Sequence, residues 1–184
     1  EGKKLTETTV TKLNSNGDFA SSVTKDAEGK LISEDKNTYK NSKVVKSVYK
    51  YYENGKIASK TETTYNSKSR PKKRISTYYE NGKKQSVSET AYSYKKGYIT
   101  ETQTDGQGNL LSKEKYKEDK AGNQIMSYRK YYNDEGKVSD SYTFENTLYT
   151  DGAAKGCLKS EIIYMNGTAT NKTVYKVKKI KVTY

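Results

Sequence analysis

Few side chains in this sequence could carry catalysis. The 184 residues contain no histidine and one cysteine, Cys157, which excludes a His-dependent triad, a histidine zinc site and an imidazole-activated thiol. We expect Cys157 to be an idle thiol. Carboxylates that could pair for glycoside hydrolysis stand beside turn residues, where acidic groups serve solvation and local hydrogen bonds: Glu53, Glu80, Asp134 and Glu135. The sequence therefore predicts a protein that is not an enzyme, with no catalytic, cofactor or metal site.

Two other kinds of side chain could bind a ligand. The formal net charge of +13 favours anionic partners through long-range attraction. The densest cationic segment is a candidate polyanion patch made of Arg70, Lys72, Lys73 and Arg74. The 19 tyrosines include three adjacent pairs whose rings could stack on sugar faces while their hydroxyls stay wet, and these are candidate ligand contacts: Tyr51, Tyr52, Tyr78, Tyr79, Tyr131 and Tyr132.

Several partner classes fit these side chains. An anionic cell-wall polymer or glycan would use both the lysines and the rings, whereas a protein partner would use exposed strand edges or a groove. Nucleic acid is the least favoured class, because the lysines are spread over the whole chain. Tyrosine pairs that simply cover a thin sheet explain the same pattern without any ligand. No apolar run approaches the length of a membrane span.

The tyrosine pairs belong to a repeated unit. Tyr-Tyr-Glu-Asn-Gly-Lys occurs at residues 51–56 and again at 78–83. An Asn-Gly pair between strand-forming residues predicts a two-residue type I′ hairpin turn. Turn glycines at positions 29, 55, 82, 108 and 136 repeat every 26 to 28 residues, with a second set of turn signals between them. We therefore expect an all-β antiparallel meander of about 12 strands.

The turn at Asn54 and Gly55 also predicts a register. Strict pairing sets Glu53 opposite Lys56, Tyr52 opposite Ile57 and Tyr51 opposite Ala58. The same rule sets Arg74 opposite Glu89 in the next unit. A longer turn or a bulge is expected in the unit at Gly136, which has an extra residue before its glycine.

Strict alternation then mixes charged, aromatic and hydroxyl side chains on both faces. Leu, Ile, Val and Phe supply only 27 of the 184 residues, so a two-layer core would be thin. Both observations favour a single extended, twisted sheet or an open half-barrel, with a closed barrel as the alternative. No composition shift marks a linker, so residues 1–184 are predicted to form a single domain.

The hairpin motif resembles two bacterial repeat families. Its Tyr-Tyr-x-Asn-Gly-Lys core is similar to variant MORN repeats, and its tyrosine, acidic residue, glycine and apolar residue are similar to the YD repeats of large secreted proteins. Weaker copies cover residues 26–31, 105–110, 119–124 and 131–138. The period is longer than either family usually shows, and the Gly-x-Trp and Gly-x-Tyr elements of MORN second strands are missing. The resemblance implies hairpin architecture and a secreted or envelope setting, and it carries no catalytic residues.

Together these observations predict a non-enzymatic, extracellular or cell-surface repeat module. Its expected role is structural, or the binding of anionic or glycan envelope polymers. A protein-interaction scaffold is the alternative. The chain starts at Glu1 without a methionine, which we interpret as a mature exported protein or a trimmed sequence.

Overall fold

The described part of the chain consists of β-strands and turns. The computed structural model describes residues 6–119, 122, 124–148 and 158–174. Within these residues there are 13 strands: β1 (Glu7–Leu13), β2 (Phe19–Asp26), β3 (Leu31–Lys40), β4 (Lys43–Glu53), β5 (Lys56–Tyr65), β6 (Pro71–Glu80), β7 (Lys83–Lys95), β8 (Tyr98–Asp105), β9 (Leu110–Glu118), β10 (Gln124–Tyr132), β11 (Val138–Leu148), β12 (Leu158–Met165) and β13 (Thr168–Val174).

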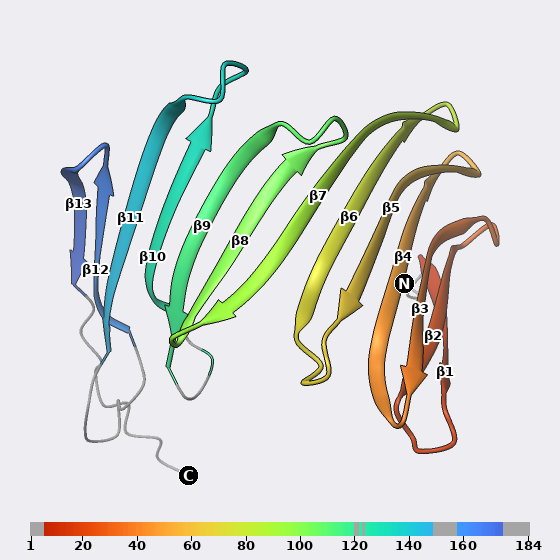
Figure 1. Cartoon of the computed structure of the whole chain (residues 1–184). Helices are drawn as coiled ribbons and strands as arrows, with labels where there is room; N and C mark the ends of the chain where they lie inside the picture. Colours follow the sequence, from red (N-terminus) through yellow and green to blue (C-terminus); the bar gives the residue numbers. More distant parts are fainter. Residues whose placement is uncertain (1–5, 120–121, 123, 149–157, 175–184) are drawn as a thin grey trace, which may run out of the picture. The chain divides into compact units, whose positions relative to one another are not determined.

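The strands follow one another in the sheet in chain order, from β1 to β13 (Figure 1). This confirms the predicted all-β antiparallel meander. The order is linear, with β1 and β13 each having one neighbour among the described strands, so the topology is that of an open sheet. No helix with the length and apolarity of a membrane span occurs in the described part of the chain. Cys157 lies outside the described residues.

The chain divides into two compact units, which we describe separately. Unit 1 comprises residues 1–92 and 103–108, and unit 2 comprises residues 93–102 and 109–184. Strands β1 to β6 belong wholly to unit 1, and strands β9 to β13 belong wholly to unit 2. Each unit therefore contains several complete hairpins of the repeat.

The turns are of two kinds. At the Asn-Gly turns both central residues have positive φ, 50° and 72° at Asn54 and Gly55 and 52° and 78° at Asn81 and Gly82. This confirms the type I′ conformation, whose twist matches that of the flanking strands. Longer turns are closed by a side chain: the Asn66 Oδ1 accepts hydrogen bonds from the backbone N–H groups of Lys68 at 2.9 Å and Arg70 at 3.1 Å.

Every strand pair whose register is described contains a bulge close to its turn. All ten such pairs shift register one or two residue pairs inside the turn, and the extra residue always lies on the strand that follows it. In β4–β5, Tyr52 lies opposite Ile57 as predicted, but Tyr51 lies opposite Ser59, because Ala58 is the inserted residue. The strict register is therefore wrong beyond the second pair. A bulge occurs in β10–β11, where the sequence predicts a longer turn or a bulge, and also in the nine other pairs.

These bulges change which side chains share a face. An inserted residue moves all later residues to the opposite face from the one that strict alternation assigns. Away from the turns, one face of β3 to β5 carries the facing row Glu34, Lys50 and Lys60, which belongs to what we call the charged face. The other face carries a row across five strands in which serine and tyrosine alternate: Ser33, Tyr51, Ser59, Tyr78 and Ser86. The predicted mixing of both faces is wrong here, because the bulges sort most charges onto one side.

The sheet has no hydrophobic core in its described residues. No hydrophobic side chain is buried, and the two buried polar residues are Thr63 and Ser127. Side chains instead meet one another across and along the strands: Glu62 forms an ion pair with Lys46 of the neighbouring strand at 2.6 Å and with Lys60 of its own strand at 2.9 Å. Cross-strand pairs of this kind contribute roughly 0.2–1 kcal/mol each, so many must act together.

The bulged register makes a prediction for Glu89. Strict pairing couples it to Arg74, whereas the structure joins it to Lys73 at 2.6 Å and places Arg74 opposite Thr90. A double-mutant cycle of Lys73→Ala and Glu89→Ala, measured by urea unfolding, should give a coupling of about 0.2–1 kcal/mol. The matched cycle of Arg74→Ala and Glu89→Ala should give a smaller value. A larger coupling to Arg74 would contradict the bulge.

Candidate functional site

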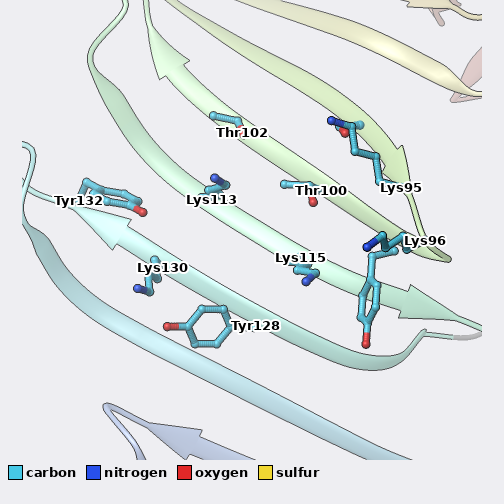
Figure 2. Close-up of a pocket in the computed structure, with 11 residues that line it drawn as sticks. Lys95, Lys96, Thr100, Thr102, Lys113, Lys115, Tyr128, Lys130 and Tyr132 are labelled. Carbon is cyan, nitrogen blue, oxygen red and sulfur yellow. The ribbon is translucent and has the colours of Figure 1, made fainter.

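A groove rich in lysine and tyrosine lies within unit 2. Its volume is about 740 Å³, and it is lined from strands β7, β8, β9 and β10 and the β7–β8 turn. Five lysines and three tyrosines line it, together with three hydroxyl residues and no aspartate or glutamate: Lys95, Lys96, Lys113, Lys115, Lys130, Tyr98, Tyr128, Tyr132, Ser93, Thr100 and Thr102. Figure 2 shows side chains from adjacent strands gathered over one side of the ribbon. We call this site the lysine groove.

Strand alternation and register bring these residues together. Lys113 and Lys115 are two apart on β9 and so share a face, while Glu114 between them points to the other. Across the β9–β10 ladder, Lys113 lies opposite Lys130 and Lys115 lies opposite Tyr128. Two like charges therefore face each other directly, an arrangement that costs stability in an antiparallel sheet.

Glu114 of β9 and Glu101 of β8 form hydrogen bonds on the opposite face. The Glu114 carboxylate accepts hydrogen bonds from the Ser127 hydroxyl and the Arg129 guanidinium, with the Arg129 Nε at 2.9 Å. Burial raises the pKa of Glu114, but these hydrogen bonds outweigh it and hold that pKa below its usual range. Tyr116 donates to Glu101 at 2.9 Å, and burial together with this bond raises the Tyr116 pKa. Carboxylates thus neutralise one face and leave the groove cationic.

Two of the groove lysines lie over tyrosine rings. The Lys115 Nζ lies 4.3 Å from the centroid of the Tyr98 ring, and the Lys130 Nζ lies 5.5 Å from that of Tyr128. Within the described residues, none of the five lysines forms an ion pair. Such a site can attract anions and present hydroxyl donors and flat rings beside them.

The structure divides each predicted tyrosine pair between the two faces. Tyr132 lines the lysine groove, while Tyr131 lies on the opposite face and meets Tyr142 edge to face, with centroids 5.9 Å apart. Tyr51 and Tyr78 stand in the serine–tyrosine row, and Tyr78 is 55% exposed.

Their neighbours Tyr52 and Tyr79 belong to the charged face of unit 1. The Tyr52 hydroxyl donates to the Glu34 carboxylate at 2.7 Å. Tyr79 lies opposite Lys84. The six predicted tyrosines therefore do not form one surface.

The predicted basic patch is also divided. Arg70 is exposed in a turn, and Lys72 is the inserted residue of the β5–β6 bulge. Lys73 is paired with Glu89, while the Arg74 guanidinium lies 5.6 Å from the centroid of the Tyr92 ring. Because Lys73 and Arg74 are consecutive on β6, their side chains point to opposite faces.

Sequence reasoning missed most of the lysine groove. The available signal was the alternation of Lys113, Glu114 and Lys115, which separates cations from an acid by face. Asp105 caps a hairpin turn, because its carboxylate accepts a hydrogen bond from the Gln107 N–H at 2.9 Å. In the described residues no three His, Cys, Asp or Glu side chains gather as a metal site would require.

No protein-family model matches the chain, and no curated protein matches it. Among solved structures, the chain is similar to a porin-like protein from Bacteroides vulgatus, with a TM-score of 0.40 and 13% identity over 96% of this chain and 88% of that chain. A likeness at this level assigns neither a fold family nor a function. The hairpin architecture implied by the resemblance to YD and MORN repeats is present, whereas membership of either family stays a prediction.

The Glu114 contacts make the fold sensitive to acid. A carboxyl group whose pKa is lower in the folded than in the unfolded chain stabilises the fold at pH values above its unfolded pKa, which is about 4.3. This stabilisation is lost as the pH falls through the folded pKa. Glu114→Gln should destabilise the protein at pH 7 by about 1–3 kcal/mol and reduce the loss of stability between pH 7 and pH 3. Thermal unfolding followed by circular dichroism measures both, with the exposed Glu118→Gln as control. An unchanged pH profile in Glu114→Gln would contradict this role.

Proposed function

We propose that this protein is a non-enzymatic module, exported or attached to the cell surface, that binds an anionic polymer in the lysine groove. The observation that carries the proposal is the set of five lysines lining one groove without a carboxylate among them. Cations that face each other cost stability, and an anionic ligand removes that cost when it binds between them.

The size of the groove favours a chain of anionic groups over a single ion. Neighbouring strands are about 4.8 Å apart, so the path from β7 to β10 covers about 14 Å. Lysines occur at both ends of that path, Lys95 on β7 and Lys130 on β10. One phosphate or carboxylate cannot reach both ends, whereas a linear polymer can contact them in turn.

The tyrosines favour a polymer that also contains sugars. Tyr98, Tyr128 and Tyr132 line the groove together with the lysines, and the rings of Tyr98 and Tyr128 lie close to Lys115 and Lys130 respectively. Aromatic rings offer flat apolar surfaces with a polar hydroxyl at one end, which suits stacking on sugar faces. An acidic glycan or a sugar-phosphate polymer of the cell envelope combines both features. The net charge of +13 adds long-range attraction to such a surface.

A binding titration tests this proposal. With inorganic polyphosphate as the probe, the wild-type chain should bind and should lose affinity as salt is added. Lys113→Ala combined with Lys130→Ala should weaken binding about fivefold, as expected from two exposed ion pairs of 0.2–1 kcal/mol each. The control with the same charge change is Lys12→Ala with Lys25→Ala, in exposed positions outside the groove. Equal losses in both double variants would show diffuse attraction and overturn the proposed site.

A second candidate function is a scaffold that adds a partner strand to the edge of the sheet. Strand β1 has one neighbour among the described strands, and all seven of its side chains are exposed. They include Val10 at 57% and Leu13 at 62% exposure. An exposed edge strand with apolar side chains offers unpaired backbone groups to an extended peptide.

Pull-down from the cell envelope separates the two functions. A scaffold should recover a specific protein partner, and Val10→Lys should abolish that recovery because charged side chains block edge pairing. The same substitution should leave polyphosphate binding unchanged. Recovery that survives Val10→Lys would rule out the β1 edge as the contact.

A further inference from the structure

The two units carry the same repeat position with opposite charge. In unit 1, Ser33 lies opposite Tyr51 and the next residue, Glu34, lies opposite Lys50. In unit 2, Ser112 lies opposite Tyr131 and the next residue, Lys113, lies opposite Lys130. Both positions come five residues after a turn glycine, at 29 and 108. Glu34 and Lys113 are therefore equivalent in sequence and in register.

In unit 1 the charge at this position is neutralised by an ion pair. Glu34 accepts hydrogen bonds from the Lys50 Nζ at 3.0 Å and from the Tyr52 hydroxyl at 2.7 Å. The bond from Tyr52, and then that from Lys50, lower the pKa of Glu34, which keeps the carboxylate charged. The cavity beside it measures about 280 Å³ and is lined by Glu34, Asp35, Lys36 and Lys50 among others, so its charges balance.

In unit 2 the same position leaves the site cationic. Lys113 replaces the carboxylate, so Lys130 has a lysine opposite it where Lys50 has its ion-pair partner. Tyr132 holds the place of Tyr52, after the equivalent lysine, and lines the groove without that carboxylate beside it. Lys36 and Lys115 are also equivalent, two residues further along their strands, whereas Val48 in the unit 1 cavity stands where Tyr128 lines the groove.

We propose that, in the two equivalent sites formed by β3 with β4 and by β9 with β10, the residue at the position of Glu34 and Lys113 determines whether the site binds anions. A lysine, as at Lys113, leaves an open anion site, and a glutamate, as at Glu34, closes the equivalent site in unit 1 with an internal ion pair. The inference rests on the proposed function, because it explains where in the repeat that function resides. It adds a second, closed copy of the site, which one substitution should open.

Charge exchange between the two positions tests this inference. Lys113→Glu should weaken polyphosphate binding at least tenfold, because it removes one cation and supplies Lys130 with an internal partner. Glu34→Lys should add a second binding site, seen as a doubled stoichiometry in calorimetry. The combined Lys113→Glu and Glu34→Lys variant has the net charge and composition of the wild type. It should bind with restored affinity, and bound polyphosphate should protect Lys50 rather than Lys130 from acetylation.

Two control variants make the same changes in charge at other positions, so they separate the effect of the position from the effect of net charge. Lys117→Glu makes the same charge change on β9 outside the groove lining, and Glu28→Lys makes the opposite change in an exposed turn. Each should change affinity less than twofold and leave the stoichiometry unchanged. Thermal unfolding of all variants confirms that they fold, and Lys113→Glu should raise the Tm by creating an ion pair.

The outcomes separate this inference from the proposed function. A wild-type chain that binds no polyphosphate overturns the proposed function, and the inference with it. A wild-type chain that binds while Lys113→Glu binds equally well overturns the inference alone. Protection of Lys130 in the exchanged variant, or effects of the controls as large as those of the exchange, would also overturn it.

Discussion

Cross-strand pairing is the interaction on which the whole structure depends. No hydrophobic side chain is buried in the described residues, so no core can hold the strands in place. The backbone ladder and the side chains that meet across it carry the stability, and the register of each hairpin decides which side chains meet. That register is fixed at the turn and then changed by the bulge beside it.

The bulge also determines which charged side chains each face of the sheet carries. In unit 1 it brings Glu62 between Lys46 and Lys60, and it leaves the serine–tyrosine row on the opposite side. In unit 2 the same sorting gathers lysines on one face while Glu114 and Arg129 pair on the other. Separate faces let one strand supply both a structural ion pair and a ligand-binding cation.

The fold could be predicted from the sequence because the turns depend on local residues. The lysine groove could not, because it depends on which residues pair across strands. Asn54 and Gly55 favour positive φ by their own chemistry, so the turns and the strands between them could be predicted. Ala58 and Gln85 have no property that marks them as inserted residues, so Tyr51 and Glu89 received the wrong partners. Lys113 and Lys130 lie on different strands among many other lysines, and only the register shows that they face each other.

A sheet without a core can vary its faces at little cost to its fold. Exchanging a carboxylate for a lysine at one repeat position, as between Glu34 and Lys113, changes an ion pair between partly exposed groups worth about 1 kcal/mol or less. In a protein with a packed core, burying such a change would cost several times more. Both units keep the bulged backbone ladder while the charge of the face differs. Different parts of the repeat therefore determine folding and binding. The turns and the backbone ladder determine the fold, and single exposed positions determine what the sheet binds.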